Sequence, residues 1–198
     1  EQQAQFRSVD FNAYPGVLLP APVAVSAALN DFFLQHLRRM FDARRVIHMH
    51  SRLALVTLAP SMLRPYQWVC HRDSEGMDPQ QSLQASVLYL FHAAELGGTS
   101  FYEPVLTPGE TARLFHDASI LSNEAFTLRY GLKPGYLCGS NRYFTRVGSV
   151  APKWNRLIFY DGGSLHSGDI GAPEKLSDDP VSGRLTLNGF FTCRRNAV

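Results

Sequence analysis

Residues 52–58 read RLALVTL, and residues 184–193 read RLTLNGFFTC. Both stretches are rich in aliphatic, β-branched and aromatic residues, and Pro60 follows the first. Such runs are typical of β-strands, in which successive side chains point to opposite faces of a sheet. By the same criteria we predict further strands at residues 66–70, 85–91, 100–103, 136–138, 143–147 and 156–160. Residues 168–183, rich in Gly, Pro, Ser and Asp, are expected to form a long loop.

Two segments repeat their apolar residues every three to four positions instead. Residues 25–41 do so, which predicts a helix packed on a sheet. Residues 108–127 follow the capping box Thr107-Pro108-Gly109-Glu110 and predict a second helix. Residues 1–22 are expected to be irregular. The order helix, strands, helix, strands predicts a mainly β protein with flanking helices, of the α+β class, as a sandwich or an open barrel.

Composition limits the classes of protein and partner. A length of 198 residues predicts a single domain over residues 1–198. Lys and Arg are scattered and the net charge is only +2, so no nucleic-acid partner is expected. No apolar run reaches the ~18 residues that span a membrane, so no membrane partner is expected either. Three widely spaced cysteines predict neither disulfides nor a zinc cluster, which favours the cytoplasm. The chain starts at Glu1, which leaves open whether leading residues were removed.

The tripeptide His71-Arg72-Asp73 ends one predicted strand, and His166 ends another. Residues two apart on a strand share a face, so His71 and Asp73 are expected to point the same way. Two histidines and one carboxylate form the facial triad that binds non-heme Fe(II). The triad hypothesis competes with a plainer one, a His–Asp hydrogen bond at a surface strand end.

A basic residue opens the last predicted strand. Arg184 shares a face of that strand with Thr186, and its guanidinium can bind a carboxylate through two parallel hydrogen bonds. Gln67 is expected to share the face of His71 and to line the same pocket.

The order His71, Asp73, His166 and Arg184 resembles the Fe(II)- and 2-oxoglutarate-dependent oxygenases, in their prolyl-4-hydroxylase-like branch. The chain resembles most an uncharacterised bacterial family of that type. The resemblance covers about residues 50–193. It implies a double-stranded β-helix (jelly-roll, cupin-like) core over 50–193, with the helix at about 108–127 as an insert.

The resemblance also implies cofactors and roles. His71, Asp73 and His166 would hold Fe(II), with 2-oxoglutarate as co-substrate and O2 as oxidant. Arg184 would bind the far carboxylate of 2-oxoglutarate, helped by Thr186 or Tyr89. The expected reaction is hydroxylation of a substrate, coupled to decarboxylation of 2-oxoglutarate to succinate.

The chain departs from that branch in two respects that bear on the substrate. Arg184 follows His166 by 18 positions, where the branch has roughly ten, and the helical insert also reshapes the mouth of the site. A prolyl substrate is therefore not carried over. The substrate is expected to be a small molecule or a peptidyl group, and a homodimer is left open.

Two other interpretations are kept. One is a non-catalytic, cupin-like metal-binding protein, which acts as a sensor or binding module. A cupin could use a pair such as His48 and His50 as metal ligands, but no acid accompanies them, and we expect them not to be ligands. The other is a structural or interaction domain in which the triad pattern is accidental.

Overall fold

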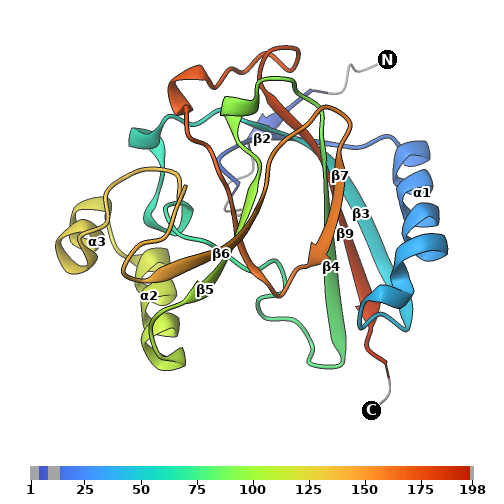
Figure 1. Ribbon diagram of the computed structural model, residues 1–198, viewed down its shortest axis with the longest axis horizontal. Coiled ribbons are helices and arrows are strands. Elements are labelled where there is room, and N and C mark those ends of the chain that lie inside the picture. Colours follow the sequence, from blue (N-terminus) through green and yellow to red (C-terminus); the bar gives the residue numbers. More distant parts are fainter. Residues whose placement is uncertain (1–4, 9–13, 197–198) are drawn as a thin grey trace.

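The computed structural model describes residues 5–8 and 14–196, and its strands form two antiparallel sheets (Figure 1). The larger sheet has the strand order β1-β2-β3-β9-β4-β7. Its strands are β1 (Arg7–Ser8), β2 (Gly16–Pro20), β3 (Arg45–Val56), β9 (Arg184–Arg194), β4 (Gln81–Tyr89) and β7 (Leu157–Asp161). The two stretches of sequence that define the fold therefore pair directly, as β3 and β9.

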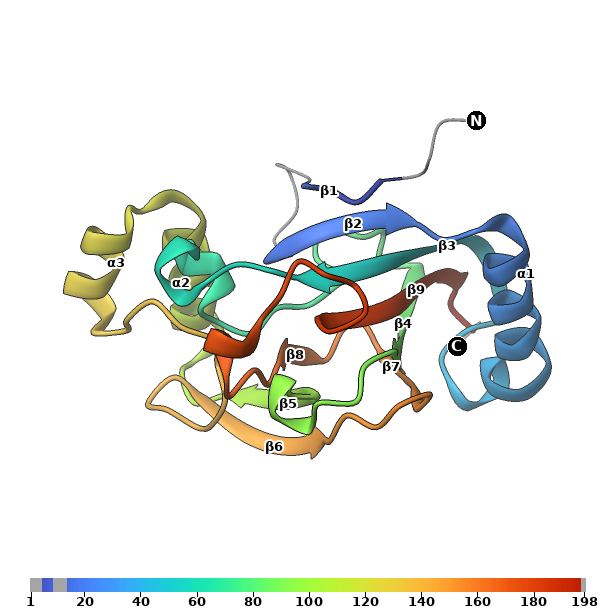
Figure 2. The same ribbon diagram turned by 90° about the horizontal axis from the view of Figure 1, so that it is seen from above.

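The smaller sheet has the order β6-β5-β8 and lies across from the larger one (Figure 2). Its strands are β6 (Phe144–Val150), β5 (Thr99–Pro104) and β8 (Leu165–Gly168). An isolated bridge between His71 and His166 attaches a further segment to β8. The two ends of the predicted triad thus meet at one edge of the smaller sheet.

Helices cover the outside of the sheets. Helix α1 (Val23–Phe32) continues through a π-helical turn (Phe33–Leu37) and a 3-10 turn (Arg38–Met40). Helices α2 (Pro108–Ile120) and α3 (Asn123–Tyr130) lie at the opposite end of the molecule in Figure 1. Short 3-10 turns occupy Pro60–Met62, Pro65–Gln67, Ala94–Leu96 and Pro173–Lys175. Within the part of the chain that is described, no helix has the length and apolar character to cross a membrane.

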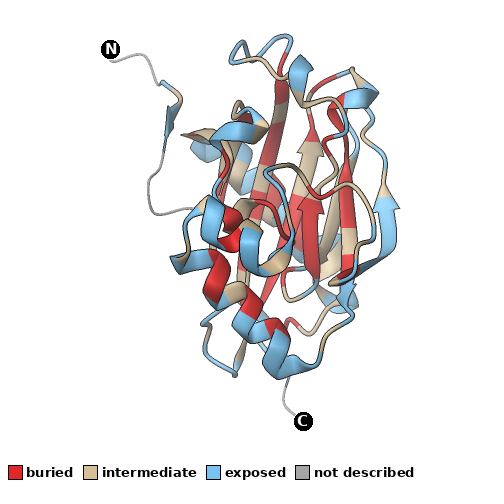
Figure 3. Ribbon diagram, turned by 90° about the vertical axis from the view of Figure 1, so that its left-hand side faces the viewer, coloured by how far each residue is buried: buried red, intermediate tan, exposed pale blue. Residues whose placement is uncertain are grey.

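The two faces of β9 have different tasks. Phe191 and Cys193 on its outer face are fully buried against Leu29 and Phe33 of the first helical segment. A second core joins α2 and α3 to the smaller sheet, and includes Leu114, Phe126, Trp68, Tyr102 and Phe144. Figure 3 shows the buried residues concentrated on the strands and on the inner sides of these helices. The inner face of β9 points to the space between the sheets and carries mostly polar residues.

The prediction of a mainly β protein with flanking helices is confirmed. Two predicted strands are absent. Residues 66–70 begin in a 3-10 turn that Pro65 opens, and residues 136–138 follow Pro134-Gly135 without forming a strand. Residues 1–22 are not uniformly irregular, because β1 and β2 add two strands there. Within that stretch, residues 1–4 and 9–13 lie outside the described residues.

The predicted helices have different bounds. The segment 108–127 is two helices, because Ser122 starts α3 by accepting a hydrogen bond from the Ala125 amide (3.2 Å). The capping box is present: Thr107 accepts from the Glu110 amide at 3.4 Å and its own amide donates to the Glu110 carboxylate at 3.0 Å. The segment 25–41 is α-helical only as far as Phe32.

Candidate metal centre

Backbone hydrogen bonds fix the three residues of the predicted triad. His71 and His166 each donate an amide hydrogen bond to the carbonyl of the other, at 3.0 Å in both directions. Two residues on, the Asp73 amide donates to the Gly162 carbonyl at 2.8 Å. The tripeptide therefore runs beside the segment that carries His166, although it is not a regular strand.

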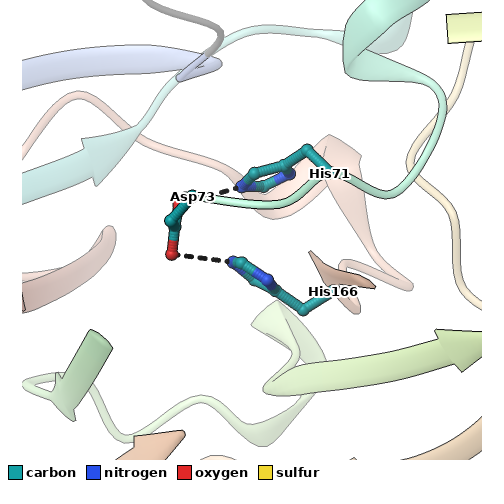
Figure 4. Close-up of side chains that lie close together, drawn as sticks. All are labelled: His71, Asp73 and His166. Atoms are coloured by element: carbon teal, nitrogen blue, oxygen red, sulfur yellow. Dashed lines mark ion pairs between the residues drawn. The ribbon is translucent and has the colours of Figure 1, made fainter. Parts of the chain in front are cut away.

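The three side chains converge on one point (Figure 4). One ligand atom from each of His71, Asp73 and His166 lies within 4.8 Å of the other two. The Nε2 atom of His71 is 3.6 Å from one Asp73 carboxylate oxygen, and Nε2 of His166 is 3.5 Å from the other. The arrangement brings together two imidazoles and one carboxylate as a set of potential metal ligands.

The surroundings of the triad fit a metal. Asp73 Oδ2 is shielded from solvent and has no hydrogen-bond partner, so a cation would satisfy it. His166 Nδ1 lies 3.0 Å from the Ser164 carbonyl oxygen. A donated hydrogen bond there leaves the lone pair of Nε2 for a metal, the usual support for a ligating histidine.

Electrostatics favour the protonation states that ligands need. Burial and the neighbouring His71 lower the pKa of His166 to about 4, against an opposing effect of Asp73, so its imidazole is neutral at pH 7. Burial raises the pKa of Asp73, but the two histidines and Arg52 together lower it by more. The net pKa of Asp73 therefore lies below its ordinary value. A neutral imidazole and an ionised carboxylate are the forms that bind metals.

A cavity of about 720 Å³ lies between the sheets and includes all three residues in its wall. Arg184, Thr186 and Gln67, the further predicted site residues, line the same cavity. Gln67 does so from a 3-10 turn rather than a strand, and its Oε1 accepts a hydrogen bond from the Arg64 amide at 2.8 Å.

Arg184 is buried, with 5% of its surface exposed. Its Nε donates to the carbonyls of Leu96 (2.9 Å) and Gly97 (3.2 Å), and its Nη2 donates to that of Gly98 (2.9 Å). These bonds fix the guanidinium through Nε and Nη2, and they leave Nη1 available to bind a ligand. No Asp or Glu in the described part of the chain forms an ion pair with it. The wall thus contains a fixed, buried cation without a carboxylate.

Tyr89 and Thr186 lie beside this cation. Thr186 pairs with Tyr89 across β9 and β4. The Tyr89 hydroxyl is 2.8 Å from Oγ1 of Thr99, which lines the cavity, and Tyr89 itself is fully buried. Burial raises the pKa of Tyr89, so its hydroxyl stays protonated. Tyr89 is therefore not part of the cavity wall itself, but is hydrogen-bonded to Thr99, which is.

His48 and His50 lie inside β3, which begins before the strand predicted at residues 52–58. Their rings stack at 5.6 Å, and that of His50 lies 5.0 Å from the Phe190 ring. Neither belongs to a cluster of three potential metal ligands among the described residues.

Sequence reasoning missed several residues of the cavity wall. Tyr160 packs edge-on against the His166 ring at 4.7 Å, and burial raises its pKa. Tyr14, from the stretch expected to be irregular, lines the wall, and burial raises its pKa to about 12. Arg52 and Asn188 also line it. The one available signal was the charge of Arg52, directly before the apolar run at residues 53–56.

Comparisons with known proteins give a family and a distant structural likeness. The crystal structure of EvdMO1 is 17% identical, with a TM-score of 0.43; the match covers 100% of this chain and 39% of that one, so this chain spans less than half of that protein's length. No curated protein matches the chain. The model of one family matches residues 1–191, nearly the whole chain. The chain therefore belongs to the family described as a family of unknown function (DUF6445).

Proposed function

We propose that this protein is an Fe(II)- and 2-oxoglutarate-dependent oxygenase of the hydroxylase type. One observation carries the proposal: a single cavity has the triad of His71, Asp73 and His166 in its wall together with a buried, carboxylate-free Arg184. A metal and a fixed cation in one cavity suit a co-substrate that chelates metal at one end and carries a carboxylate at the other.

The sheet topology supports a double-stranded β-helix. Strands β3-β9-β4-β7 of the larger sheet face β6-β5-β8, and the segment at His71 pairs with β8 through its bridge. Counting that segment, eight strand positions are divided between two facing antiparallel sheets. A jelly roll likewise divides eight strands between two antiparallel sheets. We therefore propose a jelly-roll core, with α2 and α3 as the insert.

The residues divide into two groups by task. His71, Asp73 and His166 would hold Fe(II) on one side and leave the opposite coordination positions open. When bound, Fe(II) with 2-oxoglutarate and O2 supplies the oxidising chemistry. Arg184 would bind the far carboxylate through Nη1 and its charge, while the carbonyls of Leu96 and Gly98 prevent the guanidinium from turning away.

The solvent exposure of the triad gives the direction of approach. The His166 side chain is 7% exposed and that of Asp73 14%, whereas the His71 side chain is 47% exposed. A substrate, whether a small molecule or a peptidyl group, would enter from the His71 side. The buried side, with Tyr160 against His166, excludes water from the chemistry.

A second candidate is a non-catalytic, cupin-like metal-binding protein. The observation that favours it is that three backbone carbonyls already bind Arg184, which gives this residue a structural role without any co-substrate. The two candidates differ in 2-oxoglutarate binding, which only the oxygenase requires.

Anaerobic titration of the Fe(II)-loaded protein with 2-oxoglutarate tests the proposal. We expect the visible charge-transfer absorbance of an iron-bound 2-oxo acid, and its loss in an Asp73→Ala control. Aerobic incubation with ascorbate should then release succinate, and a substrate from a metabolite and peptide panel should increase the rate. Iron binding without any 2-oxoglutarate binding would reject the oxygenase and favour the second candidate.

A further inference from the structure

A second arginine lies in the cavity wall, away from Arg184. Arg52 of β3 stands directly opposite Asn188 of β9 in the strand register. Its guanidinium carbon lies 4.9 Å from the centre of the Phe190 ring, a cation–π distance that holds the side chain along the wall. Both Arg52 and Asn188 line the cavity.

Both side chains have unused polar atoms. Arg52 Nε and Asn188 Oδ1 are shielded from solvent, and neither has a hydrogen-bond partner. No Asp or Glu of residues 5–8 and 14–196 forms an ion pair with Arg52. Because unpaired buried donors and acceptors are costly, an unused donor and an unused acceptor side by side indicate a ligand that satisfies both.

The proposed co-substrate cannot be that ligand. On β9, Arg184 and Asn188 are four residues apart on the cavity face, a separation of about 13 Å along an extended strand. A 2-oxoglutarate molecule that chelates the metal and reaches Arg184 has used both of its carboxylates. Arg52 would therefore face a different molecule.

The charges of the wall point to an anion. The Lys, Arg, Asp and Glu residues of the wall are Arg52, Arg72, Arg184 and Asp73. A bound metal would neutralise Asp73, and 2-oxoglutarate would neutralise Arg184. Arg72 is exposed, and its Nε donates to the Gly163 carbonyl at 2.9 Å. Arg52, whose charge also interacts with Asp73, remains as a cation beside the metal centre.

We propose that Arg52 and Asn188 bind the primary substrate, and that this substrate is an amino acid or a closely related amino-carboxylate. Its carboxylate would accept hydrogen bonds from Arg52, and its amino N–H would donate to Asn188 Oδ1. That the bound molecule is then oxidised rests on the proposed function, whereas the binding itself does not.

Titration with matched ligands tests the subsite. The probes are the twenty common amino acids and their carboxamides, added to the full chain both without metal and with Ni(II) plus saturating 2-oxoglutarate. We expect at least one amino acid to bind, and its carboxamide to bind at least about tenfold more weakly. Arg52→Gln should weaken that binding about 10- to 100-fold, Arg52→Lys less, and Asn188→Ala should also weaken it, because the amino N–H loses its acceptor.

The control is Arg45→Gln, an exposed arginine on the same strand outside the cavity wall, which should bind as the wild type does. The proposal is overturned if no amino acid binds, if acid and carboxamide bind equally, or if Arg52→Gln keeps full affinity. A parallel loss of 2-oxoglutarate binding in Arg52→Gln would also overturn it, since Arg52 would then serve the co-substrate. Amino-acid binding by a wild type that never binds 2-oxoglutarate would support this subsite and reject the oxygenase.

Discussion

His71 and His166 pair through their backbones, and their rings stand 4.4 Å apart between centroids. The pairing joins two segments that are far apart in the sequence. It sets the separation of two potential metal ligands by main-chain hydrogen bonds rather than by side-chain contacts alone. The site is therefore expected to be organised before a metal binds.

Replacing either histidine should remove the metal. His71→Ala and His166→Ala each delete one of three ligands, and we expect iron or nickel content to fall from about one per chain to a small fraction of that. Metal analysis of the purified proteins, followed by calorimetric titration with Ni(II), measures the loss.

The matched control is the double variant of His48→Gln and His50→Gln. These histidines lie on β3 outside the cluster, so metal affinity should stay within a few-fold of the wild type. Unchanged metal content in both alanine variants would contradict the site. Loss of metal in the double variant would instead assign the metal site to His48 and His50.

Removing Arg184 should weaken 2-oxoglutarate binding with little effect on the metal. Arg184→Ala deletes the buried cation that is proposed to bind the far carboxylate of 2-oxoglutarate, so we expect affinity to fall by roughly 10- to 1000-fold. Arg184→Lys should recover part of it, because a point charge replaces a planar fork. Anaerobic absorbance titration gives both affinities.

A structural role must be separated from this effect. Arg184→Ala also leaves the carbonyls of Leu96 and Gly97 without their donor, at a cost of about 1–3 kcal/mol each where they stay dry, whereas the Gly98 carbonyl keeps the Asp169 amide at 3.1 Å. Thermal unfolding of each variant therefore accompanies the titration, at a temperature where all remain folded. Wild-type affinity for 2-oxoglutarate in a folded Arg184→Ala protein would exclude the proposed role.

The order of the candidate metal ligands could be predicted from the sequence because it depends on local patterns. His71 and Asp73 are two residues apart, and Arg184 opens a strand whose polar and apolar residues alternate. The reasoning on His71 was nevertheless incomplete: residues 66–70 do not form a strand, and an isolated bridge to His166 orients the tripeptide instead.

Arg52 and Asn188 could not be brought together in the same way. Their proximity depends on the register of β3 against β9, which long-range packing decides. The break between α2 and α3 could have been found locally, because Ser122 is a good first residue for a new helix. The continuous apolar spacing across it favoured one helix instead.

The metal-free protein should lose stability as the pH falls from about 6.5 to about 4. Burial holds the pKa of His166 at about 4 in the folded state, below its ordinary value of 6.5. The unfolded chain therefore takes up a proton in this range while the folded chain resists it, so the stabilisation is complete above pH 6.5 and is lost on acidification. The loss should approach roughly 3 kcal/mol, since one pKa unit is about 1.36 kcal/mol.

Urea unfolding in the presence of EDTA at several pH values measures this dependence. His166→Gln should flatten it between pH 6.5 and 4, whereas His116→Gln, at an exposed position of α2, should not. Equal slopes in the wild type and in His166→Gln would show that His166 is not the group responsible.

Gly97, two residues before β5, should tolerate no side chain. Gly97 has a φ of +78°, and a Cβ there would lie 1.6 Å from the Asp169 carbonyl oxygen. Gly97→Ala should therefore destabilise the protein by at least about 2 kcal/mol, from backbone strain and from the clash. It should also weaken 2-oxoglutarate binding, because the Gly97 carbonyl helps to hold Arg184. Gly109→Ala is the matched control, since no atom lies within 4 Å of a Cβ there and α2 favours alanine. Urea unfolding and 2-oxoglutarate titration of the two variants give the comparison, and equal stability would contradict the role of Gly97.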